Sequence, residues 1–430
     1  MNFQDRLLRA IPGGAHTYSR GYDQYPSNAP QILTRGKGAY IYDPEGNKYL
    51  DYGMALRAVN LGYAEDEIDA AAIEQIKNGN NLTRPSMVEL EAAELLVDLI
   101  DSVDMVKFTK NGSTAVSAAV KLARAYTGRE LVARCAEHPF FSYDDWFIGS
   151  TPLTRGIPQE TIEKTKMFRY NDIASLEALI AAHPGKFACV ILEPAATEEP
   201  KDDFLQKVQA LCRAHGIVFV LDEMITGFRW HMKGAQHLYG VTPDLCTFGK
   251  AMANGFAVAC IAGRREIMEL GSIEFEGRER VFLLSTTHGA EMCGLGAFVA
   301  TTRFMEKHKV VEHLWEYGRK LIDMMQRQAN AHGIGDSFKV GGIPCSPYYL
   351  TLDSAGASSL GLRTLFSQEM IRNGVLMPWI ALSYRHGEAE LAATERAIDQ
   401  AFNTYRLALE EGVDKYLHGP AIKPVFRKHN

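Results

Sequence analysis

Short apolar runs alternate with longer amphipathic segments through the middle of the chain. Segments of helical periodicity, such as Glu89–Ile100 and Thr114–Tyr126, separate the short runs. Four of the short runs have the length of strands; they are Met105–Phe108, Leu131–Arg134, Phe187–Leu192 and Ile217–Leu221. Strands buried on both faces are apolar at nearly every position, and strands that alternate with helices form parallel sheets. The pattern therefore predicts an α/β fold with a mostly parallel central sheet.

The two ends of the chain follow a different pattern. Near the N-terminus, Ala39–Tyr42 and Lys48–Tyr52 flank an Asp-Pro-Glu-Gly turn sequence, which predicts a β-hairpin. Towards the C-terminus, "SPYYLTL" and "GVLMP" predict a second sheet, and a long helix covers Glu388–Glu411 before Gly412.

These patterns predict two domains, as expected for a chain of 430 residues. We expect a large domain over residues 66–290 and a smaller α/β domain over residues 291–430. The N-terminal segment, residues 1–65, is expected to pack with the smaller domain.

Composition and charge exclude several classes of protein. The hydrophobic fraction of 46% is ordinary for a soluble globular protein, and a net charge of -6 gives no basic surface for nucleic acid. No apolar run approaches the ~20 residues of a membrane span, and no secretory h-region follows Met1. The seven cysteines are scattered, without a CxxC motif or a metal-binding cluster, which is typical of buried thiols in a reducing compartment. We therefore expect a cytoplasmic protein that binds no metal, nucleic acid or membrane.

Two carboxylates, Asp222 and Glu223, follow the apolar run at Ile217–Leu221. In open α/β sheets, ligands bind at the carboxyl ends of the strands, so Asp222 stands where a carboxylate can face a ligand. A helix N-cap or a loop residue is the alternative interpretation of Asp222. We expect Glu223 to hold nearby loops or a subunit interface.

Small and polar residues lead from the apolar run "MVKFT" into a helix. Asn111–Thr114 precede an Ala-rich segment that ends at Gly128. The unpaired N–H groups and the dipole of a helix N-terminus attract phosphate, and small side chains let a phosphate approach the backbone. A Ser/Thr N-cap without a ligand is the alternative. No GxxxxGK is present, so this is not a Walker loop.

A lysine, Lys250, lies between the apolar runs "LCTF" and "AVACIAG". Burial of an ammonium group is costly, so a buried lysine is paired, neutral or used covalently. A lysine whose amine extends to solvent is the alternative. A phosphate-binding helix, an aspartate at a strand end and a lysine downstream of it together match the needs of pyridoxal phosphate. The lysine forms the Schiff base, the helix holds the phosphate, and the aspartate keeps the pyridine nitrogen protonated.

The segment "LDEMITGFR…GAQHLYGVTPDLCTFGKAMANG" closely resembles the cofactor segment of class III, pyridoxal-phosphate-dependent aminotransferases. It is especially similar to glutamate-1-semialdehyde aminomutase and its relatives, among them sugar and ω-aminotransferases. The resemblance extends to "IPGG", "GAYIYDPEGNKYLDY", "NGSTAVSAAVKLARAYTGR" and the Glu-Pro at 193–194. It implies the type I, aspartate-aminotransferase-like fold and a homodimer with shared active sites.

The resemblance also implies roles for individual residues. Lys250 matches the Schiff-base lysine and Asp222 the partner of the pyridinium. Glu193 matches a family glutamate near the cofactor. Thr287 matches the threonine that reaches the phosphate of the neighbouring subunit's cofactor, with Thr286 as its competitor. The residues that match the phosphate loop are Gly112, Ser113 and Thr114.

Several positions depart from the family pattern. The usual Tyr-His-Gly is replaced within "CAEHPFFSYDDWFIGS", where Phe140 takes the place of the aromatic ring that stacks on the cofactor. His138, in the same segment, is either a catalytic residue or a loop histidine without a role. Ala290-Glu291-Met292 stand in place of Gly-Asn-Pro after the threonine.

Substrate-binding candidates come from three positions. Glu198 falls where several ω-aminotransferases carry a gating glutamate, but no C-terminal arginine clearly matches its partner. Arg20 aligns with a substrate-carboxylate arginine of the aminomutase, with a surface arginine as the alternative. Arg385, in "SYRHGE", is a second candidate anchor.

Three functions are compatible with these features. The first is a transaminase that moves an amino group from an amino-acid donor, glutamate, to an aldehyde or ketone acceptor. The aromatic and polar segment "HTYSRGYDQY" would suit a keto- or aldehydo-sugar acid as acceptor. The second is an aminomutase, which performs the same half-reactions on one molecule. The third is a non-catalytic binding protein on the same fold, which the pair Asp222 and Lys250 disfavours.

Overall fold

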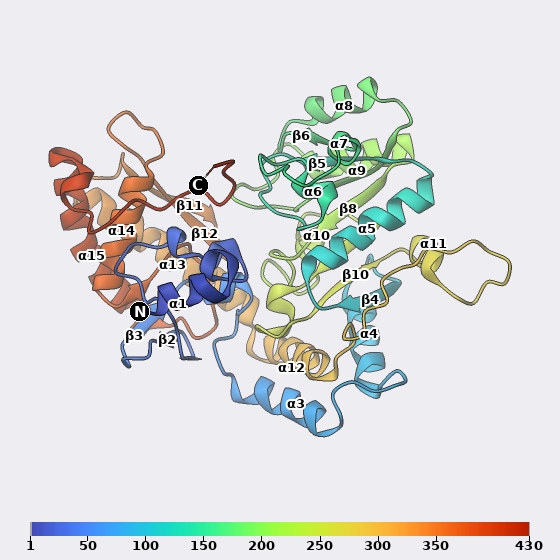
Figure 1. The fold of residues 1–430 in the computed structure, drawn as a ribbon, viewed down its shortest axis with the longest axis horizontal. Coiled ribbons are helices and arrows are strands. Elements are labelled where there is room, and N and C mark those ends of the chain that lie inside the picture. Colours follow the sequence, from blue (N-terminus) through green and yellow to red (C-terminus); the bar gives the residue numbers. More distant parts are fainter. Residues whose placement is uncertain (1, 430) are drawn as a thin grey trace. The chain divides into compact units, whose positions relative to one another are not determined.

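The structure is a computed structural model that describes residues 2–429 (Figure 1). Internal contacts divide the chain into two compact units. The small unit contains the described residues up to Glu65 together with Glu312–Arg427, and the large unit contains Asp66–Val311 with residues 428 and 429. The large unit extends beyond residue 290, where the sequence pattern placed the boundary, because the helix that follows packs against two helices of the large unit.

A seven-stranded mixed sheet forms the centre of the large unit (Figure 1). Its spatial order is β4-β10-β9-β8-β7-β5-β6. Strand β10 runs antiparallel to both of its neighbours, and the other strands share one direction. This is the mostly parallel sheet that the apolar runs predict. The strands are β4 (Met105–Thr109), β5 (Leu131–Cys135), β6 (Thr165–Phe168), β7 (Phe187–Leu192), β8 (Val218–Asp222), β9 (Leu245–Phe248) and β10 (Ala259–Gly263).

The two central strands β7 and β8 are buried along their whole length. Phe219 and Leu221 of β8 pack in a core cluster with residues of α8 and α9. Since side chains alternate between the faces of a strand, Val218 and Val220 point to the opposite face, where α5 packs. Helices therefore cover both faces, which explains why these strands are apolar at successive positions.

Along the chain, helices of the large unit lie before, between and after these strands (Figure 1). Helix α12 packs against α3 and α4. The α-helices are α3 (Asp66–Lys77), α4 (Met87–Leu99), α5 (Gly112–Thr127), α6 (Asp145–Ile148), α7 (Gln159–Glu163), α8 (Ile173–Ala182), α9 (Phe204–His215), α10 (Ala235–Leu238), α11 (Arg265–Met268) and α12 (Met292–His308), and the 3-10 helices are η4 (Lys250–Ala253) and η5 (Glu269–Gly271).

The small unit contains two small sheets rather than one. The predicted hairpin forms between β2 and β3, and β13 extends its sheet by pairing parallel with β3. The run "SPYYLTL" instead pairs antiparallel with the preceding strand in a separate sheet. The two C-terminal runs therefore belong to different sheets, because "GVLMP" finds its partner in the N-terminal segment. The strands are β1 (Arg35–Lys37), β2 (Tyr40–Tyr42), β3 (Lys48–Asp51), β11 (Phe338–Ile343), β12 (Ser346–Thr351) and β13 (Val375–Leu376).

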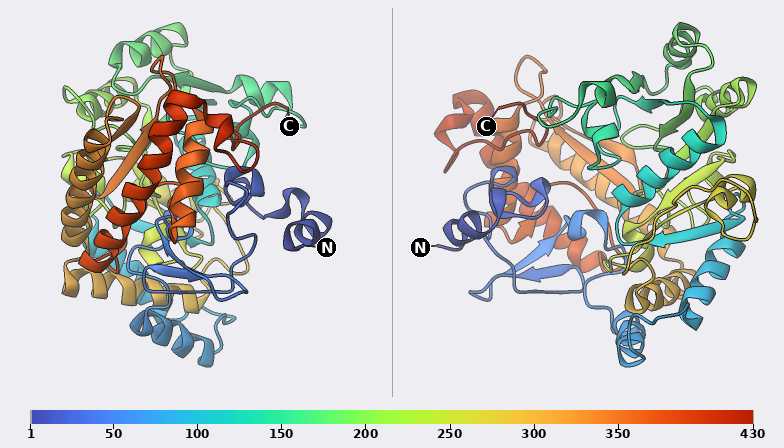
Figure 2. Two further views of the ribbon diagram at one scale, coloured as in Figure 1. Left: turned by 90° about the vertical axis from the view of Figure 1, so that its left-hand side faces the viewer. Right: turned by 45° about the vertical axis from the view of Figure 1, so that its right-hand side comes forward.

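Helices α14 and α15 lie side by side in the small unit (Figure 2). Helix α15 ends at Glu411, as predicted, because Gly412 with φ +94° takes up the C-cap position. The helices are α1 (Phe3–Ala10), α2 (Met54–Arg57), α13 (Val310–Ala331), α14 (Leu360–Arg372) and α15 (Glu388–Glu411), with 3-10 helices η1 (Pro12–Gly14), η2 (Tyr18–Arg20), η3 (Tyr22–Gln24) and η6 (Val413–Lys415). Within residues 2–429, no helix has the length and apolar character needed to cross a membrane.

The four residues of α2, Met54–Arg57, have positive φ angles between +39° and +67°. Non-glycine residues pay a conformational cost in this left-handed region, so the turn requires support from its surroundings. Asp51 provides it by accepting hydrogen bonds from the backbone N–H groups of Gly53 and Met54 at 2.7 and 2.9 Å. The Tyr63 hydroxyl donates to Asp51 at 2.6 Å and accepts from the Ala55 N–H at 2.9 Å.

Candidate active site

One edge of the large sheet gathers most of the predicted site residues. Because β4, β5, β7, β8 and β9 run in the same direction, their carboxyl ends meet at this edge. The ends of these strands and the segments that follow them contain Gly112, Ser113 and Thr114; Phe140; Glu193 and Glu198; Asp222; and Lys250. Thr287 also belongs to the large unit, whereas Arg20 and Arg385 belong to the small unit.

Asp222 is the last residue of β8 and is only 3% exposed. Its Oδ1 accepts hydrogen bonds from the backbone N–H of Met224 at 3.0 Å and from the Thr247 hydroxyl at 2.9 Å. Burial raises the pKa of the Asp222 carboxyl, while the positive charge of Lys250 and these two hydrogen bonds lower it. A buried carboxylate of this kind is stabilised by a nearby cation, as a protonated ring nitrogen would be.

Lys250 is the first residue of η4, which follows β9, the strand next to β8. Strands β8 and β9 pair with Asp222 opposite Thr247, and Lys250 follows Thr247 by one short turn. The backbone of Lys250 has φ +45°, in the left-handed region. The positive charge of Lys250 lowers the pKa of the Asp222 carboxyl.

Met224 joins three parts of this site, and the sequence patterns did not single it out. A Cβ added at Gly112 would lie 2.8 Å from the Met224 Sδ, and one added at Gly249 would lie 2.6 Å from the same atom. Any larger residue at either glycine would displace the methionine. Met224 thus packs between the start of α5 and the residue before Lys250, directly after Asp222 and Glu223. Two glycines next to predicted ligands were the only sign of this close packing in the sequence.

The start of α5 is capped by Asn111. The Asn111 Oδ1 accepts hydrogen bonds from the Thr114 N–H at 2.9 Å and from the Thr114 hydroxyl at 3.0 Å. The Ser113 hydroxyl accepts a hydrogen bond from the Tyr143 N–H at 3.1 Å. The N-cap alternative is therefore present in the structure, and it is compatible with phosphate binding because the helix dipole remains.

Phe140 lies on a loop that is fastened to α5. Ser117 donates a hydrogen bond to the Asp144 carboxylate and accepts one from the Trp146 indole N–H at 2.9 Å. The Phe140 ring contacts Phe147 edge-on, with 5.7 Å between centroids, and is 47% exposed. An exposed ring on a fixed loop at the sheet edge is available to stack on a flat ligand.

The structure resolves the role of His138 in the packing of this edge. Its Nδ1 accepts a hydrogen bond from the Glu193 backbone N–H at 3.0 Å, and burial lowers its pKa to about 4. The imidazole is therefore neutral at physiological pH and joins the loop after β5 to the loop after β7. The ring also packs against Tyr170, whose hydroxyl donates to the Pro194 carbonyl at 2.6 Å.

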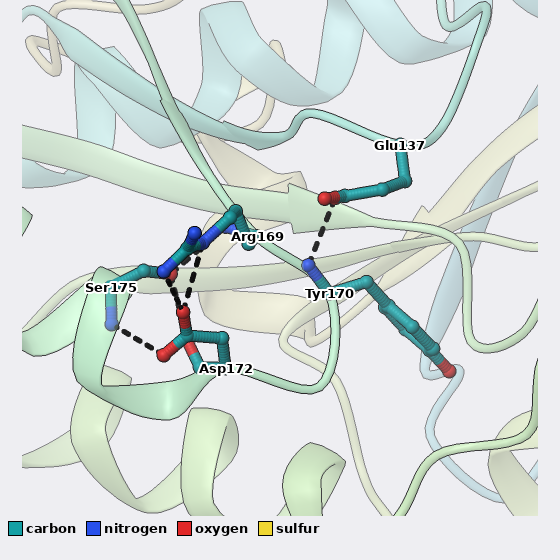
Figure 3. A network of polar contacts seen from close by, with 5 residues as sticks. All are labelled: Glu137, Arg169, Tyr170, Asp172 and Ser175. Carbon is teal, nitrogen blue, oxygen red and sulfur yellow. Dashed lines mark hydrogen bonds and ion pairs between the residues drawn. The ribbon is translucent and has the colours of Figure 1, made fainter.

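A polar network supports Tyr170 from the other side (Figure 3). The Glu137 carboxylate accepts a hydrogen bond from the Tyr170 N–H at 2.9 Å. Asp172 caps α8 by accepting from the Ser175 N–H at 3.1 Å, and it forms an ion pair with Arg169 at 2.5 Å. These contacts fix the segment after β6, and through Tyr170 they support the loop that carries Glu193.

Comparison with known proteins shows the family to which this chain belongs. The model of the class III aminotransferase family matches residues 21–343. The chain belongs to the class III aminotransferases. It is 33% identical over 411 residues to 3-aminobutyryl-CoA aminotransferase from Cloacimonas acidaminovorans (strain Evry), covering 93% of this chain and 96% of the relative. It is 29% identical over 418 residues to glutamate-1-semialdehyde 2,1-aminomutase from Francisella philomiragia subsp. philomiragia, covering 93% of this chain and 94% of the relative.

A solved structure shares the fold of this class III aminotransferase. The pyridoxal phosphate internal aldimine form of the Sphingopyxis sp. MTA144 FumI protein superposes with a TM-score of 0.87 at 27% identity, covering 95% of this chain and 97% of the other. The fold is the type I fold of pyridoxal-phosphate-dependent transaminases, as predicted, and pyridoxal phosphate is the cofactor. The buried Asp222, the lysine beside it and the small residues at the α5 N-terminus fit that cofactor chemically.

Glu223 has a different environment from Asp222 in this aminotransferase. It is fully buried and accepts hydrogen bonds from the Ala235 N–H at 2.9 Å, the Gln236 N–H at 2.8 Å and the Thr226 hydroxyl. Burial raises the pKa of Glu223, and these hydrogen bonds lower it. The carboxylate caps the start of α10 and holds the loop that follows Asp222, in agreement with the expectation that Glu223 holds nearby loops.

The threonine loop of the aminotransferase precedes α12. Thr286 and Thr287 are both exposed, and the Thr287 carbonyl accepts a hydrogen bond from the Asn81 side-chain amide at 3.1 Å. A Cβ added at Gly289 would lie 2.4 Å from the Thr286 hydroxyl oxygen, so the loop turns tightly at this glycine. Both threonines stay candidates for the phosphate contact.

The three substrate-binding candidates lie in different surroundings. Glu198 forms an exposed ion pair with Lys201 at 2.7 Å. Arg20 is exposed at the end of η2. Arg385 is engaged by Glu65, which accepts hydrogen bonds from its Nε and Nη2 at 2.7 and 2.6 Å. This bidentate pair occupies the planar edge of the guanidinium that would otherwise bind a substrate carboxylate.

Proposed function

We propose that this enzyme moves an amino group from an amino-acid donor, glutamate, to an aldehyde or ketone acceptor. The relationship between Asp222 and Lys250 carries the proposal, because a buried carboxylate and a lysine leave adjacent strands at one edge of the sheet. When bound, pyridoxal phosphate supplies the electron sink that stabilises the carbanion formed at the amino acid's α-carbon. Asp222 supports this chemistry by keeping its negative charge next to the ring nitrogen.

We assign Lys250 two tasks: covalent attachment of the cofactor and, once released, transfer of the substrate α-proton by its amine. Gly112, Ser113 and Thr114 are assigned to the phosphate, together with Thr287 or Thr286 of the neighbouring subunit in a homodimer. Phe140 is assigned to stack on the ring, and Glu193 is assigned a place near the cofactor.

The acceptor is proposed to be a small carbonyl compound, with keto- and aldehydo-sugar acids among the candidates. The exposed Tyr18 and Tyr22, around Arg20, support an acceptor with hydroxyl groups and a carboxylate. The names of the two relatives add the keto counterpart of an aminoacyl-CoA, and an amino aldehyde, to the classes worth testing. We also place the enzyme in the cytoplasm, since its cysteines are free thiols, and all but Cys293 are buried.

An aminomutase is the second candidate, because the similarity to glutamate-1-semialdehyde 2,1-aminomutase extends over 93% of this chain. The two functions differ in whether the amino group leaves the donor molecule. Glutamate alone should convert to 2-oxoglutarate in an amount matching the enzyme if the enzyme is a transaminase. A glutamate-loaded enzyme is then offered aldehydes, semialdehydes, 3-oxoacyl thioesters and oxidised sugars, and the aminated product is identified by mass spectrometry. Failure of every donor amino acid to react would contradict transamination.

A further inference from the structure

An ion pair joins the segment that leads into α5, the helix assigned to the phosphate, to the segment that leads into α12. The Lys110 ammonium lies 2.5 Å from the Glu291 carboxylate, and both side chains are about three-quarters buried, with exposed fractions of 25% and 28%. The other Glu291 oxygen accepts a hydrogen bond from the Asn80 side-chain amide at 2.9 Å. The hydrogen bond from Lys110 lowers the pKa of Glu291 more than its other contacts do, so the carboxylate is ionised at neutral pH.

Glu291 is free to make this contact because another residue caps its helix. Glu291 occupies the N-cap position of α12, but its side chain does not cap the helix. Asn80 does so instead: its carbonyl accepts from the Met292 N–H at 2.7 Å, and its Oδ1 accepts from the Cys293 N–H at 3.0 Å. The carboxylate therefore extends away from the helix end and towards Lys110.

The cluster connects two segments that carry proposed phosphate ligands, one for this subunit's cofactor and one for the cofactor of the neighbouring subunit. Lys110 immediately precedes Asn111, which caps α5 and holds Thr114. Glu291 ends the loop that carries Thr286 and Thr287, and Asn81 holds the Thr287 carbonyl. The ion pair is therefore a direct contact between these two segments.

We propose that Lys110 and Glu291 form a clamp that positions the phosphate-binding residues and thereby sets the affinity of the enzyme for pyridoxal phosphate. This inference rests on the phosphate assignments of the proposed function. Lys110 and Glu291 are positioning residues, which act through the start of α5 and the threonine loop. The clamp uses this chain's own departure from the family, since Glu291 stands in the Ala-Glu-Met that replaces Gly-Asn-Pro.

A clamp and a purely electrostatic effect lead to opposite changes in cofactor affinity when the charge at Glu291 is removed. If the two charges acted only through their fields, loss of the negative charge at Glu291 would strengthen binding of the phosphate dianion, and loss of the positive charge at Lys110 would weaken it. If the pair acts as a clamp, either loss lets the two segments move and both changes weaken binding.

The test is a titration of the apoenzyme with pyridoxal phosphate, followed by absorbance, and a competition with inorganic phosphate. Lys110→Met and Glu291→Gln should each raise the dissociation constant of pyridoxal phosphate roughly tenfold, as expected for a residue that orients a ligand-binding group. The charge-swapped double variant Lys110→Glu/Glu291→Lys should recover most of the lost affinity. Tighter or unchanged binding by Glu291→Gln would overturn the clamp. So would a double variant whose loss of binding free energy equals the sum of the losses in the two single variants.

Two controls separate the possible failures. Lys233→Met removes a more exposed ion pair with Asp101 in the same unit, at 2.9 Å, and should leave the affinity unchanged. Ser113→Ala and Thr114→Val test the phosphate assignment itself. Weakening by these two variants without weakening by the clamp variants overturns the clamp alone, whereas no weakening by either set overturns the phosphate assignment as well. If Lys110→Met does not fold, Lys110→Arg replaces it. This variant keeps the positive charge, so it should bind pyridoxal phosphate more tightly than Glu291→Gln does, and equal weakening would contradict the clamp.

Discussion

The Thr247 hydroxyl donates a hydrogen bond of 2.9 Å to Oδ1 of Asp222, across two adjacent strands. Both residues are buried, so water cannot replace this bond. Thr247→Val keeps the shape of the side chain and removes the donor. A hydrogen bond to a charged group contributes about 1.5–3 kcal/mol, so we expect kcat/KM for the donor amino acid to fall roughly 10- to 100-fold. Thr247→Ser should retain most of the activity, and wild-type activity in Thr247→Val would show that Asp222 does not need this orientation.

Removal of the Asp222 carboxylate should affect both cofactor binding and turnover. Asp222→Ala would leave the ring nitrogen without the buried negative partner that we assign to it, at a cost of about 3–5 kcal/mol for a broken buried pair. We expect pyridoxal phosphate to bind at least roughly a hundredfold more weakly and turnover to be nearly abolished. Asp222→Glu keeps the charge and should be less impaired. Titration of the apoenzymes and donor half-reactions measure both effects, and equal impairment of the two variants would count against a role for the charge.

His138 should make folding stability sensitive to acid. Its folded pKa is about 4, below the unfolded value of ~6.5, because burial disfavours the charged imidazolium. Protonation therefore favours the unfolded chain, so the contribution of the neutral ring to stability is complete above about pH 6.5 and is lost as the pH falls from there towards 4. The total change is on the order of 3 kcal/mol. His138→Gln should flatten the dependence of the free energy of unfolding on pH in this window, as measured by urea unfolding; an unchanged slope would mean that His138 is exposed or charged in solution.

Arg385 and Glu65 should behave as a structural pair. Glu65 is 7% exposed at its side chain and Arg385 is 46% exposed, so the pair contributes modestly, about 1–2 kcal/mol after allowance for solvent screening. Arg385→Gln leaves the buried Glu65 carboxylate unpaired, so it should lower the free energy of unfolding more than Glu65→Gln does. Both variants should change the KM of the donor less than about twofold. If Arg385 instead anchors a substrate carboxylate, Arg385→Gln will raise KM strongly and Glu65→Gln will not.

Much of the fold was predictable because its signals are local. The end of α15 at Glu411 follows from Gly412, and the burial of β7 and β8 follows from unbroken apolar runs. The direction of β10 was not predictable, since an apolar strand pattern is the same in both directions. The pairing of β13 with β3 joins segments more than 300 residues apart, as its register of Val375 with Leu50 shows.

The types of residue in the site were predictable from the sequence, but the contacts of these residues were not. The sequence pattern indicates that Asp222 and Lys250 each stand near the end of a strand. The structure places Asp222 at the end of β8 and Lys250 just after the neighbouring strand β9. The partners of His138 and Glu291 come from distant segments, and nothing in their own neighbourhoods indicates the Glu193 N–H or the Lys110 amine. A histidine that looks catalytic in a sequence can therefore be a buried neutral acceptor.

In the proposed mechanism, Lys250 binds pyridoxal phosphate covalently, and the amino donor then displaces Lys250 from the cofactor. The most direct measurement is the absorbance spectrum of the purified enzyme with pyridoxal phosphate, before and after addition of glutamate, beside the same spectra of Lys250→Ala. We predict that the wild-type enzyme has a visible band of lysine-bound cofactor that glutamate bleaches with release of 2-oxoglutarate, and that Lys250→Ala lacks this band. A wild-type protein that stays colourless with added cofactor, or a Lys250→Ala variant with the same band, would contradict the assignment.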